Sequence, residues 1–366
     1  MKKVGIITFH EYNNYGTVLQ AFALQKKVEL MGYDSEIINF RSSLNSLSFF
    51  QKVEKRYKVA IKSIQTRKEM KLKKQAFKKF YKEYMKVGNK AYYNIAQLKK
   101  DVPEYDVYMA GSDQTWNPYL DIKSEAFFLT FAPKDKIRVS YAPSVGVGFV
   151  SPNYSEEMKK RLESVDYLSC REETGAKIIS EITGKNVPVV LDPTLLLKPE
   201  DWDKVASNYN INEPYILCYF LGEMEHCRNF AKRLSKEKNI PIYYMYATKY
   251  DCKDGNKVLN NVGPREFIYL IKNASYICTD SFHGMIFSIN YNKSFYTFCK
   301  RKEYEGSDNQ RIHDALKYFN VEDRFIEDGD KFTGEFKDMD YNHINKDIEN
   351  KRKISIEYLT HALERE

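Results

Sequence analysis

The sequence predicts an α/β protein of two Rossmann-like lobes, each built on a parallel sheet, that face a cleft. Short apolar runs alternate with helical segments along nearly the whole chain, which is typical of doubly wound sheets. The length of 366 residues is large for a single core, so two domains are expected. Loops rich in Asn, Asp, Ser, Gly or His follow several of the apolar runs, where parallel sheets bind ligands.

The first lobe is expected to span residues 1–205. Its predicted strands are apolar runs bounded by turn residues: Val4–Phe9, Glu36–Phe40, Tyr105–Ala110, Arg138–Ala142, Tyr167–Cys170 and Val187–Leu191. Helices are predicted at 17–31, where Gly32 is placed as the C-terminal stop, and at 174–181. A polar stretch at 200–213 predicts the hinge.

The second lobe is expected to span residues 213–366, and its terminal helix is expected to pack back on the first lobe. Its predicted strands are Tyr215–Leu221, Ile240–Tyr246, Tyr276–Thr279 and Phe295–Cys299. The predicted helices between them are Glu223–Lys236, Glu266–Asn273 and Gly284–Asn290. Strands and helices thus alternate again, which predicts a second parallel sheet.

The net charge of +8 is concentrated in one segment. Residues 51–90 hold 15 Lys or Arg and 3 Glu, a net +12 that leaves −4 for the rest of the chain. Four aromatic residues in this segment share one face of a predicted helix: Phe77, Phe80, Tyr81 and Tyr84. The segment is either an amphipathic helix with a solvated basic surface or a patch that attracts an anionic membrane or an acidic polymer. No nucleic-acid-binding motif accompanies the charge, so nucleic acid is not an expected partner.

Several classes of protein are excluded by what the chain lacks. No run of about 18 apolar residues occurs, and 4–9 is too short for the core of a signal peptide, so a cytoplasmic protein is expected. The six cysteines have no CxxC pairing and are expected to be buried free thiols. Gly146-Val147-Gly148 lacks the third glycine of a dinucleotide fingerprint, and neither a P-loop nor a compact His/Cys metal set is present. We therefore expect no cofactor and no bound metal.

Four loops follow predicted strands and are expected to line one cleft: 10–16, 111–118, 143–148 and 280–284. In the last of them, Asp280, Ser281 and His283 place an acid, a hydroxyl group and an imidazole beside the start of a helix. Helix N-termini present unpaired N–H groups that attract anions. The region 275–285 therefore predicts a binding site for an anionic ligand.

Six motifs occur in a fixed order along the chain. They are Asn-Tyr-Gly-x-x-Leu-Gln (14–20), Gly-Ser-Asp-Gln-x-Trp-Asn-Pro (111–118), Ser-Tyr-Ala-x-Ser-x-Gly (140–146), Arg-Glu-x-x-Gly (171–175), Leu-Asp-Pro-Thr (191–194) and Thr-Asp-Ser-Phe-His-Gly (279–284). The series resembles the polysaccharide pyruvyl transferase family from residue 4 to about residue 325. This resemblance implies a fold similar to two-lobed GT-B glycosyltransferases. It also implies transfer of pyruvate from phosphoenolpyruvate to two hydroxyls of a sugar, which forms a ketal.

The implied chemistry assigns roles to particular residues. His283 is the candidate proton donor for the enol methylene carbon, with Asp280 holding the imidazole in place. Asp113 is the candidate base for an acceptor hydroxyl. Arg171 and Arg311 are candidates for the phosphate and carboxylate of the donor. Further substrate-binding candidates in the matching motifs are Ser281, Gly284, Asn14, Gly16, Ser112 and Ser144.

Structural roles remain open for several of these residues. Arg171 is alternatively part of a structural ion pair that bridges the two lobes, Arg311 a surface helix residue and His283 a hydrogen-bonded core histidine. Asp113 is alternatively the cap of the segment that follows it. In the same way, Asp192 favours a strand-ending turn, and Trp116 is either a core residue or a sugar-stacking one.

Two other functions fit the predicted architecture. A nucleotide-sugar glycosyltransferase would need a base-binding pocket, and no motif marks one. A non-catalytic carbohydrate-binding subunit would tolerate loss of the imidazole. The expected partners are phosphoenolpyruvate and a saccharide acceptor, which is lipid-linked if the segment 51–90 contacts the inner face of the cell membrane.

Overall fold

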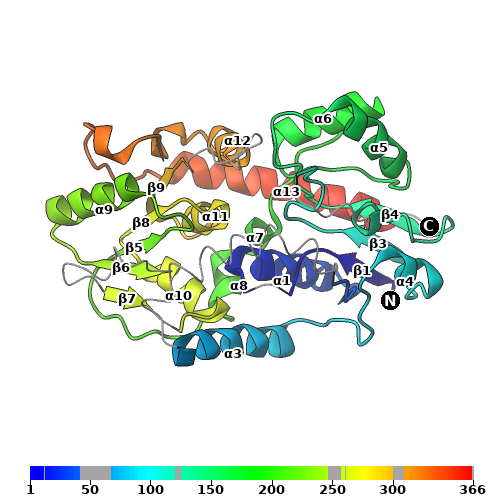
Figure 1. Cartoon of the computed structure of the whole chain (residues 1–366), viewed down its shortest axis with the longest axis horizontal. Coiled ribbons are helices and arrows are strands. Elements are labelled where there is room, and N and C mark those ends of the chain that lie inside the picture. Colours follow the sequence, from blue (N-terminus) through cyan, green and yellow to red (C-terminus); the bar gives the residue numbers. More distant parts are fainter. Residues whose placement is uncertain are drawn as a thin grey trace. The chain divides into compact units, whose positions relative to one another are not determined.

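The computed structural model describes residues 1–11, 13–41, 67–119, 125–245, 257–259, 261–299 and 309–364. The chain divides into two compact units (Figure 1). Unit 1 comprises Met1–Lys52, Lys82–Leu196 and Ile348–Glu366, and unit 2 comprises Val53–Tyr81 and Leu197–Asp347. The expectations for residues 51–66, for Cys252 and for the end of the strand at Tyr246 lie outside the described residues.

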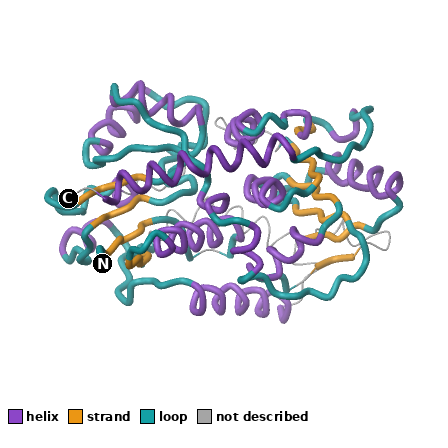
Figure 2. The backbone as a smooth tube through the Cα atoms, turned by 180° about the vertical axis from the view of Figure 1, so that it is seen from behind, coloured by secondary structure: helices purple, strands orange, loops and turns teal. Residues whose placement is uncertain are grey.

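Among its described residues, unit 1 holds a parallel sheet in the order β2-β1-β3-β4. The strands are β1 (Lys3–Ile7), β2 (Asp34–Ile37), β3 (Val107–Ala110) and β4 (Ile137–Ser140). The helices are α1 (Tyr15–Leu30), α4 (Ile95–Lys100), α5 (Pro152–Leu162), α6 (Glu173–Thr183) and α7 (Pro193–Leu196). Figure 2 shows helices packed beside the strands in each unit. Apart from the exposed Lys3 at the start of β1, the central strands are apolar and buried, as parallel sheets covered on both faces require.

The predicted strands Tyr167–Cys170 and Val187–Leu191 are wrong as continuous strands. Two isolated parallel bridges stand in their place, from Val139 to Tyr167 and from Cys170 to Val189. Pro188 has no N–H and cannot donate to a ladder, which limits pairing in this segment to single bridges. The edge of the sheet beyond β4 is therefore irregular.

Among its described residues, unit 2 holds a parallel sheet in the order β10-β9-β8-β5-β6-β7. The strands are β5 (Ile216–Tyr219), β6 (Ile242–Met245), β7 (Lys257–Leu259), β8 (Tyr276–Thr279), β9 (Ser294–Phe298) and β10 (Phe325–Ile326). The helices are α3 (Arg67–Tyr84), which unit 1 shares at its end, α8 (Pro199–Asp203), α9 (Glu225–Lys238), α10 (Pro264–Asn273), α11 (Phe282–Asn290) and α12 (Gln310–Tyr318). The long helix α13 (Asn342–Glu364) begins in unit 2 and ends in unit 1.

Two assignments of segments to units differ from the simple division of the chain. Most of α3 belongs to unit 2, although the sequence alone placed the basic segment in the first lobe. The second half of α13 belongs to unit 1, where Ser355 Oγ accepts a hydrogen bond from Leu191 N at 2.9 Å and Tyr358 donates to the carbonyl of Ser140 at 2.8 Å. Arg352 in the same part of the helix donates to the carbonyl of Leu195 at 2.7 Å. Side chains of α13 thus satisfy backbone groups of the unit 1 loops.

Helix α1 ends as the sequence predicts. Asn14 is its N-cap and accepts a hydrogen bond from Thr17 N at 3.2 Å. Gly32 follows the last turn with φ +90°, a conformation that favours glycine. The helix therefore starts at the loop that follows β1, beside the carboxyl ends of β1 and β3.

Candidate active site

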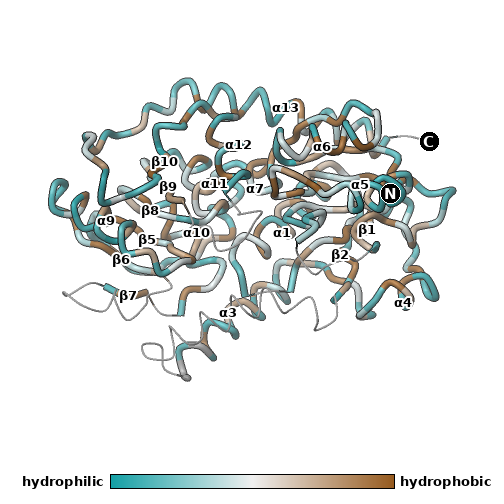
Figure 3. The backbone as a smooth tube through the Cα atoms, turned by 45° about the horizontal axis from the view of Figure 1, so that its top comes forward, coloured by the Kyte–Doolittle hydropathy of each residue, from teal (hydrophilic) through white to brown (hydrophobic). Residues whose placement is uncertain are grey.

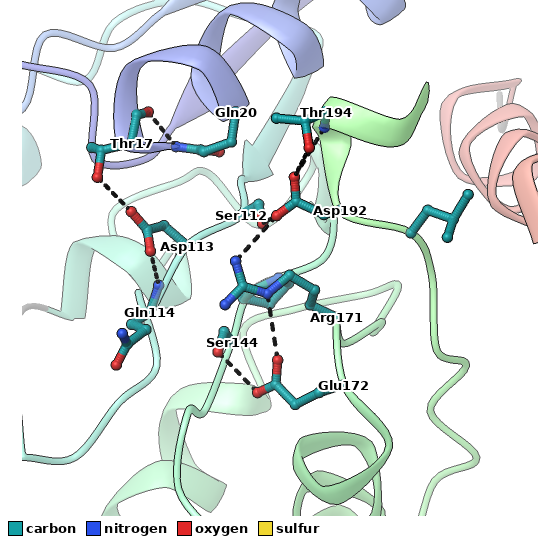
Figure 4. Close-up of polar contacts among 12 residues, drawn as sticks. Thr17, Gln20, Ser112, Asp113, Gln114, Ser144, Arg171, Glu172, Asp192 and Thr194 are labelled. Carbon is teal, nitrogen blue, oxygen red and sulfur yellow. Dashed lines mark hydrogen bonds and ion pairs between the residues drawn. The ribbon is translucent and has the colours of Figure 1, made fainter. Parts of the chain in front are cut away.

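Asp113 lies directly after β3 and is the centre of a hydrogen-bond network in unit 1 (Figure 4). Its Oδ2 accepts from Thr17 Oγ1 at 2.8 Å, and its Oδ1 accepts from Gln114 N at 2.9 Å. The residue has φ +76°, in the left-handed region that Asp and Asn enter more readily than most residues. Asp113 therefore caps its own turn and joins that turn to α1.

Arg171 is the centre of a buried charge cluster in the same unit (Figure 4). Its Nη1 donates to Asp192 Oδ2 at 3.1 Å, and its Nε lies 3.6 Å from Glu172 Oε2. Burial alone would lower the pKa of Arg171, but Glu172, Asp192 and Asp113 outweigh burial and raise that pKa. Asp192 and Glu172 both belong to unit 1, so these ion pairs lie within one unit, whereas the alternative interpretation expected an ion pair between the lobes.

Glu172 organises the loop after β4. Its Oε1 accepts hydrogen bonds from Ser144 Oγ at 2.9 Å and from the backbone N–H groups of Val145 and Gly146 at 2.8 and 3.0 Å. Gly146 has φ +70°, and a Cβ there would lie 2.9 Å from Gln114 Oε1. The loops after β3 and β4 therefore pack directly against each other, and one carboxylate holds the second of them.

Ser112, Asn14 and Gly16 occupy supporting positions around Asp113. The Ser112 hydroxyl lies 3.4 Å from Asp192 Oδ2, and its carbonyl accepts from Thr8 Oγ1 at 2.7 Å. Asn14 is the cap of α1, and Gly16 is its buried second residue. Unit 1 thus brings Asn14, Gly16, Ser112, Asp113, Ser144 and Arg171 into adjoining loops, as expected for the carboxyl edge of a parallel sheet.

Trp116 does not serve as an exposed stacking surface. Its side chain is fully buried, stacks on Phe128 with ring centroids 5.3 Å apart and donates Nε1–H to the carbonyl of Phe127 at 3.0 Å. A buried indole with a satisfied N–H is a core residue. The core role that the sequence left open for Trp116 is the correct one.

In unit 2, Asp280 follows β8 and binds the loop that follows β5. Its Oδ1 accepts from Leu221 N at 2.5 Å, and its Oδ2 accepts from Gly222 N at 2.8 Å. Arg228 of α9 donates Nη1–H to the carbonyls of Gly222 and Met224, so the same loop is held from two sides. These hydrogen bonds make Asp280 a residue that fixes the shape of the loop.

Ser281 is the N-cap of α11, and its Oγ accepts from Gly284 N at 3.4 Å. The helix consequently begins at Phe282, two residues earlier than the sequence predicts, because the hydroxyl of Ser281 takes the cap position. His283 and Gly284 therefore lie in the first turn of α11, where the N–H groups of a helix favour negative charge.

His283 and Arg311 are brought to the same aromatic ring. The imidazole of His283 packs edge-on against Phe282, with ring centroids 5.2 Å apart, and the Arg311 guanidinium lies 5.6 Å from the centre of that ring. Both residues are mostly buried: 6% of the surface of His283 and 7% of the surface of Arg311 is exposed to solvent. Arg311 is thus not the surface helix residue of the alternative interpretation. Unit 2 combines an imidazole, a guanidinium and a helix N-terminus within one region.

Gly284 is needed because another side chain approaches it closely. A Cβ at this position would lie 2.5 Å from Thr279 Oγ1 and 3.1 Å from Tyr219 Cδ1. Gly284→Ala is expected to lower the free energy of unfolding by about 1–3 kcal/mol, although alanine is the better helix former. Urea unfolding measures this change. A double-mutant cycle tests the cause. Thr279→Ala should lower the free energy of unfolding less in the Gly284→Ala background than in the wild-type protein, because it removes the clashing hydroxyl group. If the two effects simply add, the proposed clash is wrong.

His10 belongs to the polar loop after β1 but is fully buried. Burial lowers its pKa to about 4, Arg41 lowers it further, and the Thr8 carbonyl at 2.9 Å from Nδ1 acts in the opposite direction. Between pH 6.5 and pH 4 the unfolded chain binds a proton here that the folded chain does not, so stability falls as the pH falls.

This titration is expected to remove about 3 kcal/mol by pH 4. Urea unfolding of the wild-type protein and of His10→Gln at pH 7 and pH 4.5 measures it, and the variant should lose less stability over that interval. His343→Gln, at an exposed position, is the matched control and should behave like the wild-type protein. Parallel pH curves for the wild type and His10→Gln would show that His10 is not responsible.

Sequence reasoning missed several residues that the network requires. Gln20 Nε2 lies within hydrogen-bond distance of Thr8 Oγ1, of the Phe9 carbonyl and of the Thr17 carbonyl. Gln20 and Glu172 stand in the ordered motifs, which was the available signal. Arg228 stands in no motif, and nothing in the sequence marked it.

Metal sites and membrane-spanning helices are both absent from the described residues. No three His, Cys, Asp or Glu side chains in this part of the chain are grouped so as to hold a metal ion. No helix in the same ranges has both the length and the apolar character that a bilayer crossing demands. The described cysteines are free, and those at 170, 218, 227 and 278 are buried.

The fold of the chain is similar to that of solved structures. The chain is similar to the UDP-GlcNAc 2-epimerase from Methanocaldococcus jannaschii, with 14% identity, a TM-score of 0.54 and coverage of 99% of this chain and 100% of that one. The S. aureus MnaA–UDP co-structure matches with 15% identity, a TM-score of 0.48 and coverage of 98% of each chain. The first likeness confirms the expected fold class, two Rossmann-like units with parallel sheets of the GT-B-like kind.

Comparison with protein families addresses identity. Curated proteins provide no match to this chain. The family model described as polysaccharide pyruvyl transferase matches residues 14–298, a range that includes all six ordered motifs but ends before Arg311. The chain therefore belongs to the polysaccharide pyruvyl transferase family and is a transferase.

Proposed function

We propose that the protein transfers pyruvate from phosphoenolpyruvate to a sugar residue of a cell-surface polysaccharide or of its lipid-linked precursor. The observation that carries the proposal is the joint packing of His283 and Arg311 around Phe282 at the start of α11. A donor with a phosphate and a carboxylate needs a cation and N–H donors, and its methylene carbon needs an acid. Unit 2 supplies all three types of group, and we assign it the donor.

The proposed reaction begins with proton transfer from His283 to the methylene carbon of the enol. The adjacent carbon becomes an oxocarbenium-like electrophile, and one sugar hydroxyl adds to it. Phosphate then leaves with the C–O bond electrons, and the neighbouring hydroxyl adds to close the ketal. Of the two hydroxyl protons released, one restores the acid and the other goes to phosphate, so the products are the pyruvate ketal and inorganic phosphate.

Arg311 and the α11 N-terminus are assigned to the anionic groups of the donor. Arg311 carries its charge at every relevant pH, and its guanidinium matches a carboxylate or phosphate in two-point contact. The backbone N–H groups behind Ser281 add oriented partial charge without any change in structure during the reaction. Asp280 holds the neighbouring loop at Leu221 and Gly222 and acts as a positioning residue.

We assign the acceptor to unit 1. Asp113 is the proposed base for a sugar hydroxyl, and its bond to Thr17 holds the carboxylate in a single orientation. Ser112, Ser144, Asn14 and Gly16 shape the loops around it. Arg171 is already engaged by Asp192 and Glu172, which supports a role in holding these loops over direct contact with the donor. We further propose a cytoplasmic location, with the basic segment 51–90 in peripheral contact with an anionic membrane.

Mass spectrometry tests the reaction directly. Candidate saccharide acceptors incubated with the protein and phosphoenolpyruvate should gain the mass of one pyruvate ketal while an equal amount of phosphate is released. Thermal shift with phosphoenolpyruvate, compared with UDP-, GDP- and CMP-sugars, identifies the donor. Stabilisation by a nucleotide-sugar and not by phosphoenolpyruvate would replace the proposal with a glycosyltransferase function.

A further inference from the structure

Helix α3 has one face that packs and one that does not. Phe77 and Phe80 are buried, with 4% and 1% of their surface exposed to solvent. Ala76 lies against the start of α10, because a Cβ added to Gly263 would come within 2.6 Å of the Ala76 Cβ. Figure 1 shows α3 alongside α10, and Figure 3 shows hydrophilic and hydrophobic segments alternating along α3. The aromatic face that the sequence predicts is thus the face that anchors the helix.

The opposite face of α3 is a stripe of lysines. Lys71, Lys74, Lys78 and Lys82 are all exposed and are spaced by three, four and four residues, which puts them on one side of the helix. The stripe is about 16 Å long at the rise of an α-helix. At 100° per residue, Glu69 and Glu83 fall outside it. We call these four residues the lysine stripe.

The lysine stripe concentrates positive charge on one side of α3. Within the described part of the chain, none of its four lysines forms an ion pair with a carboxylate. Lysines elsewhere on the protein do so: Lys26 pairs with Glu29 and Lys99 with Glu125. Four uncompensated charges in a line produce a strong local positive potential on a chain whose remainder is, outside 51–90, net acidic.

An exposed leucine lies at the border of the stripe. Leu72 is 39% exposed and lies 100° around the helix axis from Lys71, on the flank of the stripe. A basic helical face with an exposed apolar residue at its border is the composition of helices that lie on anionic bilayers. Of the aromatic residues of α3, Phe77 and Phe80 are buried and Tyr81 and Tyr84 are partly buried, so none of them is an open stacking surface for nucleic acid bases.

We propose that the lysine stripe of α3 is a docking surface for an anionic lipid bilayer, with Leu72 in contact with the interface. The stripe is straight and protrudes from the packed face, so all four ammonium groups can reach one plane. Binding of this kind is reversible and weakens with salt, because the contacts are electrostatic and solvent-exposed. This inference deepens the proposed membrane contact and does not depend on the chemistry of pyruvate transfer.

Sedimentation of the full chain with vesicles tests the proposal, without any substrate. At about 0.05 M salt, the wild-type protein should bind phosphatidylcholine vesicles that contain phosphatidylglycerol, and about 0.5 M salt should release it. It should not bind vesicles of pure phosphatidylcholine. The variant Lys71→Gln, Lys74→Gln, Lys78→Gln and Lys82→Gln should bind about 100-fold more weakly. Glutamine has nearly the helix propensity of lysine, so α3 is retained.

A matched control distinguishes an effect of the lysine stripe from an effect of the protein's net charge. The variant Lys159→Gln, Lys160→Gln, Lys177→Gln and Lys185→Gln removes four exposed lysines from unit 1 and should bind like the wild-type protein. Equal loss in both variants would mean that only net charge matters, and it would overturn the proposal. Absence of wild-type binding at low salt would overturn it as well. Stripe-dependent binding to heparin but not to vesicles would identify an acidic polymer as the partner instead.

A fluorescent reporter locates the contact on the helix. The two native tryptophans, Trp116 and Trp202, are fully buried, so their emission should not respond to a membrane. Leu72→Trp adds an exposed indole at the border of the stripe. Its emission should shift to shorter wavelength when phosphatidylglycerol vesicles are added and return when salt is raised. Vesicle binding without any spectral change would place the contact elsewhere and overturn the proposal. Because no donor is present, failure here leaves the proposed function standing.

Discussion

Replacing His283 with alanine is expected to reduce phosphate release from phosphoenolpyruvate by about 100- to 10,000-fold, the range typical of a lost general acid. The side chain lies in the first turn of α11, packed against Phe282, and no other imidazole is assigned to this region by the sequence. A phosphate-release assay with a reactive acceptor measures the loss.

The variant His283→Asn distinguishes chemistry from structure. Asparagine keeps a polar group of similar size near Phe282 but cannot act as an acid. Phosphoenolpyruvate should still raise the melting temperature of this variant, because Arg311 and the helix N-terminus are unchanged. Loss of both donor binding and turnover would indicate a purely structural histidine, and unchanged turnover would discard the mechanism. His343→Ala, at an exposed site, should retain full activity.

Replacing Arg171 with methionine is expected to lower the free energy of unfolding at pH 7 by about 3–5 kcal/mol, the usual result of removing one partner of a buried ion pair. The side chains of Arg171 and Asp192 are only 2% and 1% exposed. Methionine fills much of the volume but leaves Asp192 and Glu172 as buried carboxylates without their cation. Urea unfolding measures the deficit, which should exceed that of most single substitutions.

The pH dependence of this deficit identifies its cause. Without Arg171, the buried carboxyl group of Asp192 has lost its cation, and burial raises the pKa of that group in the folded variant above its value in the unfolded chain. The folded variant then binds more protons, so the deficit should shrink as the pH falls from 7 towards 5. Arg138→Met is the matched control, since Arg138 and Asp166 form a partly exposed pair at 2.9 Å that is expected to contribute about 1 kcal/mol or less.

Two further outcomes decide the role of Arg171. Adding Asp192→Asn to Arg171→Met should restore part of the lost stability, because one of the unpaired charges is removed. A small deficit that does not depend on pH, together with loss of donor binding, would contradict the structural role and favour direct contact with the donor. The experiment therefore separates the two roles that the sequence left open for this arginine.

The sequence predicted the elements whose causes lie within a few neighbouring residues. The end of α1 before Gly32 and the strand β8 at Tyr276–Thr279 were both visible in short patterns, whereas α1 begins at Tyr15, two residues before the predicted start. The start of α11 was misplaced by two residues because the hydroxyl of Ser281 takes the cap position. The irregular edge beyond β4 was missed because single proline residues interrupt pairing that periodicity alone suggests.

Short sequence patterns could not predict which groups the charged residues contact. The carboxylate of Asp280 accepts hydrogen bonds from Leu221 and Gly222, which are 59 and 58 residues away in the chain. Arg171 finds Asp192 across 21 residues. Both contacts exist because neighbouring parallel strands end at the same edge of a sheet and bring their loops together.

The sequence by itself determined the alternation of strands and helices, the family and the positions of the candidate residues. These properties follow from periodicity, capping and motif order, each of which is local or can be read along the chain. Only the tertiary structure decided that Arg171 is held by two carboxylates, that Arg311 is buried against Phe282 and that the aromatic face of α3 packs while its lysines stay exposed. The physical reason is that ion pairing and burial depend on which distant segments the packed core brings within a few ångströms.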